Sequence, residues 1–288
     1  MKTAIMTDTN SGISVEEGKS MGVYVIPMPV LINGDIHYEG VNLSQEEFYD
    51  AMLAGKAVST TQPSPGDVLA LWDEILEEYD ALVYLPMSSG LSASCHTALS
   101  LARDYDGRVQ VADNHSISVP LRYAVTDALE MARAGWEAAE IKAALESAAQ
   151  DTIIYIGVDT LEYLKRGGRI TPAAAAMGGI LQIKPLLQIR GERLDAFAKV
   201  RGTVNCKKRL VEEMKICVDA CRRGGKPFDV AASGTFLTKA EEQEWICMAQ
   251  EAFPGYTIRY DPLALSIGCH VGPGAFAMGV CGRLSAAR

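Results

Sequence analysis

Short apolar runs alternate with longer segments of helical periodicity along the first half of the chain. The runs that predict extended segments are Thr3 to Met6, Val23 to Pro29, Ala81 to Leu85 and Val109 to Ala112. Between them, apolar residues recur every three or four positions, as on one face of a helix. Strands that alternate with helices in this order indicate βα units and a mainly parallel sheet.

Several helices of this half have recognisable first residues. Ser14 with Glu17, and Ser44 with Glu47, have the spacing of a capping box. Ser64-Pro65-Gly66-Asp67 combines a good N-cap, a proline at the first helical position and an acidic first turn. The predicted helices begin at Ser14, run from Ser44 through Leu53 and from Ser64 to about Tyr79, begin again near Ser92, and run from Val119 to Arg133 and from Glu137 to Ala149.

The pattern changes after about residue 150. A predicted strand from Thr152 to Gly157 precedes a helix from Leu161 to Arg166, which Gly167-Gly168 is expected to end. An alanine-rich segment, Thr171 to Gly179, follows. Pro185 to Ile189 and Arg193 to Val200 then flank Arg190-Gly191-Glu192, which predicts a hairpin.

Predicted helices and strands alternate again in the rest of the chain. The predicted elements are a helix from Val204 to Arg223, a strand near Val230, a helix from Lys239 to Ala252, a strand near Ile258 and a glycine-rich closing strand within His270 to Arg283. We therefore predict an α/β protein of two domains. Residues 1–150 form an α/β domain with a mainly parallel sheet, and residues 151–288 form an α/β domain with a mixed sheet.

Composition narrows the possible partners. The formal net charge is -9 and the sequence pI about 5.1, so the protein is poorly suited to nucleic acid or to anionic membrane surfaces. No apolar stretch approaches the ~18 residues of a membrane span, and Asp8 interrupts the short apolar start of the chain. We expect a cytoplasmic protein without a signal peptide or stable membrane insertion.

Cysteines and nucleotide-binding motifs give no sign of a cofactor. None of the seven cysteines forms a Cys-x-x-Cys pair, so we do not expect a zinc site. We expect the cysteines to be free thiols in a reducing compartment. The segment from Gly12 to Ser20 ends like a phosphate-binding loop but has one residue too many between its glycines. No ATP site, metal or cofactor is predicted.

Two loops rich in hydroxyl side chains each lead into a predicted helix. The first is Ser59-Thr60-Thr61-Gln62-Pro63-Ser64, and the second, Ser88-Ser89-Gly90-Leu91-Ser92, leaves the carboxyl end of a buried strand. Hydroxyls and helix N-termini can donate to an oxyanion, and ligands of open α/β sheets bind at the carboxyl ends of the strands. Each loop could instead be an ordinary polar turn, with Ser64 or Ser92 as an N-cap.

Basic and histidine-containing turns are further candidates. Leu164-Lys165-Arg166-Gly167-Gly168-Arg169-Ile170 could pair with a carboxylate or phosphate, or could be a solvated helix end. Lys199-Val200-Arg201-Gly202 is a second basic pair. His270 stands beside Gly272-Pro273-Gly274, where it could bind an anion or have a structural role.

Taken in order, these segments resemble the DegV family over essentially the whole chain. The resemblance rests on Met6-Thr7-Asp8-Thr9 and on the segments 60–65, 88–92, 164–170, 183–185, 199–202 and 270–274. It implies a long-chain fatty acid buried between two α/β domains, with its carboxylate held by Thr60 and Ser92. It further implies a surrounding polar shell of Thr61, Ser89, Arg169 and His270.

The resemblance also implies a partner. Family members are fatty-acid-binding subunits of a bacterial fatty acid kinase, in which a separate ATP-dependent subunit phosphorylates the bound carboxylate. Family members often continue the second loop as Ser-Gly-Thr-Tyr-Gln, whereas this chain reads Ser92-Ala93-Ser94-Cys95-His96. Two alternatives remain open: a serine acyl hydrolase with Ser92 as nucleophile and His96 or His270 as base, and a lipid-sensing regulatory protein.

Overall fold

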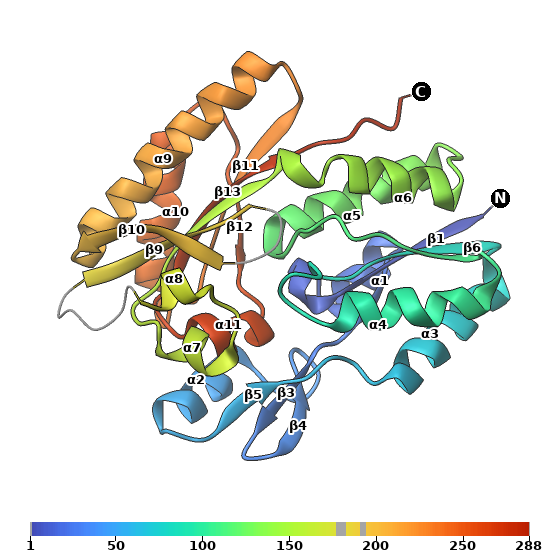
Figure 1. Cartoon of the computed structure of the whole chain (residues 1–288), viewed down its shortest axis with the longest axis horizontal. Coiled ribbons are helices and arrows are strands. Elements are labelled where there is room, and N and C mark those ends of the chain that lie inside the picture. Colours follow the sequence, from blue (N-terminus) through green and yellow to red (C-terminus); the bar gives the residue numbers. More distant parts are fainter. Residues whose placement is uncertain (1, 177–182, 191–193, 288) are drawn as a thin grey trace.

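Two larger β-sheets, one from each half of the chain, stand side by side with helices between them and on their outer faces (Figure 1). The computed structural model describes residues 2–176, 183–190 and 194–287. One of these sheets is parallel and the other mixed, so the predicted α/β class is confirmed. A small third sheet lies at one end of the molecule, below α7 and α11 in Figure 1.

The first sheet has four parallel strands in the order β2-β1-β6-β7. The strands are β1 (Thr3–Asp8), β2 (Tyr24–Ile26), β6 (Ala81–Leu85) and β7 (Val109–Val111). Leu82 and Tyr84 pack on one face with the outer helices, whereas Val83 and Leu85 belong to the core on the other face. Both faces are buried, which explains why β6 is apolar at consecutive positions.

The second sheet has six strands in the order β10-β9-β8-β13-β11-β12. Only β11 and β12 pair in parallel; the other neighbours are antiparallel. The strands are β8 (Ile153–Gly157), β9 (Ile183–Ile189), β10 (Leu194–Arg201), β11 (Phe228–Gly234), β12 (Arg259–Pro262) and β13 (Phe276–Gly282). The last strand in the sequence, β13, thus lies between β8 and β11 inside the sheet.

Helices form three layers around these two sheets (Figure 1). The outer helix pairs are α3 (Pro65–Glu78) with α4 (Ser94–Leu101) on the first sheet, and α9 (Thr203–Gly224) with α10 (Lys239–Ala252) on the second. The middle layer contains α1 (Val15–Met21), α5 (Ser118–Arg133) and α6 (Ala138–Ser147). Leu121 and Val125 of α5 share one core with Val83 and Ile156, so the middle layer joins the two sheets.

The small antiparallel sheet has the order β4-β3-β5 and carries α2 on one side. These elements are β3 (Pro29–Ile32), β4 (Asp35–Tyr38), β5 (Val58–Thr60) and α2 (Gln45–Leu53). Their apolar side chains, including Val30 and Phe48, pack against Leu265 and Cys269 of α11 (Leu265–Val271). This contact attaches an early segment of the chain to one of the last helices.

The remaining elements are short. They are the 3-10 turns η1 (Thr9–Ser11), η2 (Ala102–Tyr105) and η3 (Ala149–Asp151), and the helices α7 (Glu162–Gly167) and α8 (Pro172–Ala175). Gly168, with φ of 68°, ends α7 as predicted. The capping box of Ser44 and Glu47 and the cap that Ser64 provides for the Asp67 amide are also confirmed.

Three local predictions need correction. Val23 to Pro29 is not one extended segment, because β2 and β3 belong to different sheets. The helix expected from about Ser92 begins at Ser94. His270 does not belong to the closing strand: it lies in the last turn of α11, and the strand begins at Phe276.

Two further predictions stand differently. The antiparallel pairing of β9 and β10 confirms the hairpin. Residues 191 and 192 of its predicted turn, residue 193 of its predicted second strand and residues 177–179 of the alanine-rich segment lie outside the described residues. The domain boundary near residue 150 stays a prediction.

Candidate functional site

A cavity lies between the loops that follow β1 and β6 of the first sheet and the strands β8, β11 and β13 of the second sheet, so both halves of the chain supply its walls. The space between its lining residues is about 950 Å³, including its opening to solvent. Its lining is predominantly apolar; examples are Ile117 and Val119 from the first half and Ile156, Leu194 and Leu263 from the second.

Small residues form the floor of the cavity. Ala231 and Ser233 of β11 are paired with Gly279 and Ala277 of β13, and all four line the cavity. Alternate residues of a strand face the same side of its sheet, so these positions share one face. The intervening residue Ala232 belongs to the core on the opposite face. The sheet leaves room for a ligand here because its inward side chains are small.

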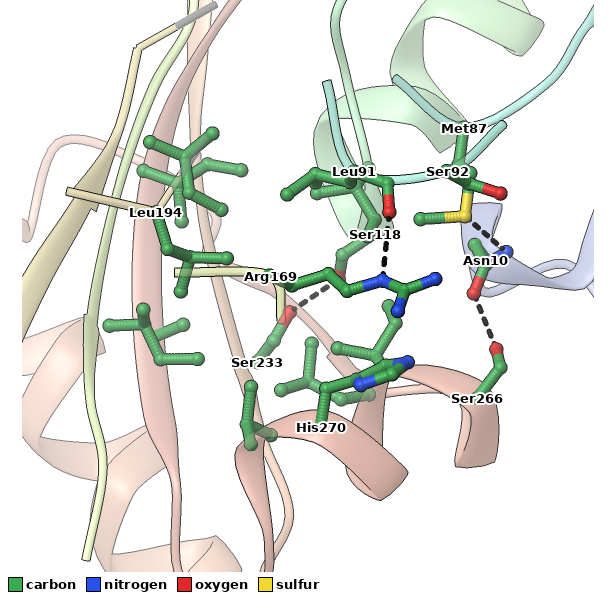
Figure 2. A pocket seen from close by; sticks show the side chains of 18 of the residues that line it. Asn10, Met87, Leu91, Ser92, Ser118, Arg169, Leu194, Ser233, Ser266 and His270 are labelled. Carbon is green, nitrogen blue, oxygen red and sulfur yellow. Dashed lines mark hydrogen bonds between the residues drawn. The ribbon is translucent and has the colours of Figure 1, made fainter. Parts of the chain in front are cut away.

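Polar groups gather where two parallel strands of the first sheet end. Asn10 follows β1 and Met87 follows β6, and these adjacent strands bring the two loops together. Asn10 Nδ2 donates to Met87 Sδ at 3.0 Å, and Asn10 Oδ1 accepts from Ser266 Oγ at 2.5 Å (Figure 2). Both Asn10 and Ser266 are buried and line the cavity.

A buried carboxyl group, that of Asp8, holds these two loops together by hydrogen bonds. Asp8 accepts hydrogen bonds from the backbone amides of Asn10 (2.8 Å) and Met87 (2.9 Å). Burial raises the pKa of Asp8 to about 6, against the opposing effect of these amides. Asp8 thereby connects the end of β1 to the loop that carries Ser92.

Thr60 and His270 form a hydrogen-bonded pair, with Thr60 Oγ1 3.0 Å from His270 Nε2. Burial, together with the nearby positive charge of Arg169, lowers the pKa of His270 to about 4. The imidazole is therefore neutral at neutral pH, with one ring nitrogen as donor and the other as acceptor. On the other side of the ring, a Cβ atom at Gly167 would lie 2.2 Å from His270 Nδ1, so only glycine allows this close approach.

Arg169 extends from the loop after α7 between Leu91 and His270 (Figure 2). Its Nε donates to the Leu91 carbonyl at 3.4 Å, and its Nη1 donates to the Gly167 carbonyl. A guanidinium has five N–H donors, so donors remain for an anion beside these two bonds. Arg169 is exposed as a residue and lines the cavity, which places a fixed positive charge at the opening.

Five of the six residues singled out in the sequence line the same cavity: Thr60, Thr61, Ser92, Arg169 and His270. Ser89 is outside the lining, and its amide donates to Asp113 Oδ1 at 3.3 Å. The Ser92 hydroxyl accepts from the Ser94 amide at 3.2 Å. Segments that are far apart in the chain thus bring these five residues to one cavity, whereas their role in binding stays a prediction.

Within the described part of the lining, sequence reasoning missed four buried polar residues: Asn10, Ser118, Ser233 and Ser266. The rule that ligands bind at the carboxyl ends of parallel strands could have identified Asn10, because it lies two residues after the end of β1. Ser118 ends a largely polar segment, residues 113–118, that follows the parallel strand β7, so the same rule could have pointed to it. Ser233 and Ser266 have no such local signal, because apolar residues or glycine flank each of them.

The arrangement is suited to an amphipathic anion. Hydroxyls of Thr60 and Ser92, the Arg169 guanidinium and a neutral His270 surround the polar end, and the wall beyond them is apolar. In Figure 2 the polar residues Asn10, Ser92 and Ser266 lie on one side and Leu194 on the other. Such a site can hold a carboxylate at one end and bury a hydrocarbon chain at the other.

Within residues 2–176, 183–190 and 194–287, no cluster of three or more histidine, cysteine or acidic side chains could bind a metal ion. In the same described part of the chain, no helix has the length and apolar character required to cross a membrane.

Comparison with known proteins gives the same family across the chain. The protein-family model described as "Uncharacterised protein, DegV family" matches residues 2–283 of this chain. A DegV domain-containing protein of Streptomyces coelicolor is 31% identical over 283 residues, covering 97% of this chain and 98% of that protein. Another, from Deinococcus radiodurans, is 37% identical over 216 residues, covering 75% of this chain and 77% of that protein.

Solved structures of similar proteins have the same fold. A fatty-acid-binding DegV family protein from Thermus thermophilus superposes with a TM-score of 0.86 at 27% identity, covering 98% of this chain and 100% of that one. DegV from Bacillus subtilis, a fatty acid binding protein, gives 0.85 at 25% identity, again with 98% and 100% coverage. The resemblance inferred from the sequence is confirmed, and the chain belongs to the DegV family.

Proposed function

We propose that this protein binds one long-chain fatty acid in the cavity between its two halves. The observation that carries the proposal is the polarity of the cavity, which is apolar along most of its wall and polar at one end. Two structurally similar relatives, from Thermus thermophilus and Bacillus subtilis, are fatty-acid-binding proteins. In this proposal residues 1–150 and 151–288 are two domains that each supply part of the wall.

The carboxylate lies among Thr60, Ser92 and Arg169, with Thr61 and His270 beside it. Thr60 and Ser92 each offer a hydroxyl donor, and Arg169 supplies the positive charge that partly neutralises the head group. His270 is neutral at neutral pH because burial and the charge of Arg169 lower its pKa to about 4. Ser89 contributes indirectly, because its amide holds the loop through Asp113.

Burial of the tail accounts for affinity. About 15 methylene groups at roughly 0.8 kcal/mol each give about 12 kcal/mol before the ordering of the ligand and the loss of its translational freedom are subtracted. The carboxylate therefore needs hydrogen-bond donors to replace water, but it does not need to contribute most of the binding free energy. Hydroxyl donors and a partly exposed arginine meet that need without a fully buried ion pair.

We further propose that the protein presents the carboxylate to a separate, ATP-dependent fatty acid kinase subunit. A carboxylate oxygen would attack the γ-phosphorus of ATP held by that subunit, giving an acyl phosphate and ADP. The support is the exposure of the polar end: Thr61 and Arg169 are exposed, whereas Ala277 and Leu194 at the apolar wall are buried. A lipid-sensing role would use the same site and differ only in what reads the bound state.

Ser92 has no catalytic role in this proposal. Its hydroxyl accepts from the Ser94 amide, and His270 Nε2 is paired with Thr60 rather than with Ser92. His96 is exposed on α4. A serine nucleophile needs a base within hydrogen-bond reach, and the described residues pair Ser92 with neither histidine. Stoichiometric labelling of Ser92 by a fluorophosphonate probe would overturn this assignment and favour an acyl hydrolase.

Native mass spectrometry of the purified protein tests the binding proposal directly. We expect a co-purifying mass of one fatty acid, or uptake of added palmitate or oleate after delipidation. The double variant Thr60→Ala with Ser92→Ala is expected to bind roughly a hundredfold more weakly in a fluorescent fatty acid displacement assay, because two hydrogen bonds to a charged group are lost. Ser100→Ala with Thr257→Ala changes two exposed hydroxyl residues and serves as the matched control.

Negative results in these measurements would refute different parts of the proposal. An empty protein that does not bind palmitate or oleate would refute fatty acid binding altogether. Unchanged affinity of the double variant would refute only the assignment of Thr60 and Ser92. Presentation to a kinase is tested by mixing loaded protein, ATP and a bacterial fatty acid kinase subunit, and by trapping acyl phosphate with hydroxylamine; absence of the hydroxamate would refute that step.

A further inference from the structure

A pair of buried hydroxyls interrupts the apolar wall of the cavity. Ser118 Oγ and Ser233 Oγ lie 3.1 Å apart and both residues line the cavity. Their exposed fractions are only 7% and 5%, so neither is a surface serine. In the view of Figure 2 the pair lies between Leu194 and the polar residues Asn10, Ser92 and Ser266.

This pair of serines has one more O–H donor than the protein provides with an acceptor. Two hydroxyls have two O–H donors, and their mutual hydrogen bond uses one of them. Within the described residues, neither side chain makes another hydrogen bond, so one O–H is left without an acceptor in the protein. A buried donor without a partner costs about 1 to 3 kcal/mol, and an oxygen atom of a ligand would remove that cost.

Elements from opposite halves of the protein hold the two serines. Ser118 is the first residue of α5, and Ser233 is the penultimate residue of β11. Ser118 has a positive φ of 58°, a conformation that costs a residue with a side chain of order 1 kcal/mol or more. The surrounding structure therefore maintains an unfavourable backbone conformation at the residue whose hydroxyl meets Ser233.

We propose that Ser118 and Ser233 form a subsite for an oxygen atom carried along the acyl chain, so that the cavity accepts hydroxy or keto fatty acids as well as unsubstituted ones. The free O–H donates to the ligand oxygen, and a hydroxyl on the ligand can donate in return to either serine. This inference rests on the proposed function, because it assigns a second polar subsite to the same fatty acid cavity.

Competition between stearate and hydroxyoctadecanoic acids tests the subsite. The hydroxyl is moved along the chain in a series of positional isomers, and each dissociation constant is compared with that of stearate. The same ratios are measured for Ser118→Ala with Ser233→Ala. Comparing ratios removes the intrinsic cost of dehydrating the ligand hydroxyl, as in a double-mutant cycle. For one position we expect the preference for the hydroxylated ligand to fall about fivefold in the variant, the value of one net hydrogen bond.

Each outcome has a defined meaning. Equal ratios in the wild type and the variant for every isomer would overturn the subsite, even if stearate binds well. Failure of the wild type to bind stearate would instead overturn the proposed function. If the double variant does not fold, the wild type alone decides: one isomer should bind more tightly than its neighbours in the series, and a flat or monotonic series would overturn the subsite. Ser100→Ala, an exposed serine outside the cavity, is the matched control and should keep wild-type ratios.

Discussion

Thr60 Oγ1 lies 3.0 Å from His270 Nε2, although 210 positions separate these residues in the chain. Thr60 is the last residue of β5 in the small sheet, and His270 lies in the last turn of α11. The apolar contact between this sheet and Leu265 and Cys269 of α11 brings them together. The small sheet therefore has a positioning role at the polar end of the cavity.

Thr60→Val should test the hydroxyl separately from the shape of the side chain. Valine retains the branched form of threonine but cannot donate to a carboxylate or pair with His270 Nε2. We expect fatty acid affinity to fall about tenfold, since a hydrogen bond to a charged group is lost. Displacement of a fluorescent fatty acid measures the change. Thr60→Ser keeps the hydroxyl and should restore most of the affinity; equal losses in both variants would show that shape, not hydrogen bonding, matters here.

Gly167→Ala should displace His270. The added Cβ would lie 2.2 Å from His270 Nδ1 and 2.9 Å from His270 Cε1, so the ring or α7 must move. We expect destabilisation of about 1 to 3 kcal/mol, as for other overpacked sites, together with weaker fatty acid binding. Urea unfolding and the displacement assay measure the two effects.

Gly66→Ala is the matched control for this substitution. Gly66 lies in the first turn of α3, where the closest atom to an added Cβ is Ser64 Oγ at 3.8 Å. Alanine at an open helical position is neutral or mildly stabilising. If Gly167→Ala behaved like Gly66→Ala in both assays, the close approach of α7 to the imidazole would have no energetic consequence.

The stability of the delipidated protein should depend on pH through His270. Its pKa is lowered from 6.5 to about 4 by burial and by Arg169. Between these values the unfolded chain binds a proton that the folded protein does not, so the free energy of unfolding falls as pH falls from 6.5 to 4. In His270→Asn, the loss of stability between pH 7 and pH 4.5 should be smaller by roughly 2 kcal/mol.

The comparison of wild type with variant isolates this contribution. Asp8 acts in the opposite direction, because burial raises its pKa from 3.8 to about 6, so its contribution to stability falls as pH rises through that range. Asp8 is present in both proteins and cancels in the difference. Urea unfolding followed by tryptophan fluorescence provides the measurement; parallel pH profiles would mean that His270 is protonated equally in the folded and unfolded states.

Ala277→Leu should shorten the space available to the acyl chain. Ala277 is 4% exposed and lies on the cavity floor opposite Ser233. Each methylene kept out of the cavity costs about 0.8 kcal/mol, or about fourfold in affinity. We therefore expect octadecanoate to lose more affinity than dodecanoate, as measured by isothermal titration calorimetry. Ala139→Leu, at an exposed position of α6, is the control; an equal loss for both chain lengths in Ala277→Leu would argue against a tail at this floor.

Much of the fold follows from local sequence signals. Ser44 and Ser64 cap α2 and α3 as predicted, and the apolar run of β6 is a strand buried on both faces. Helix α11 was missed because it is short and no side chain of its own caps it. Its first amide, that of Leu265, donates instead to Glu39 Oε2 at 2.9 Å, from a residue 226 positions earlier. A local pattern cannot reveal a partner at that distance.

The sequence alone determined the class of elements, the family resemblance and the residue types of the polar loops, because caps, glycines and hydroxyl-rich turns act within a few positions. Only the tertiary structure decided that Thr60, Ser92, Arg169 and His270 line one cavity, and that Ser89 is outside it. It also decided that Ser118 meets Ser233 in the wall of that cavity. Such contacts arise when the middle layer packs between two sheets, and side chains brought together in this way leave no periodic signal in either segment.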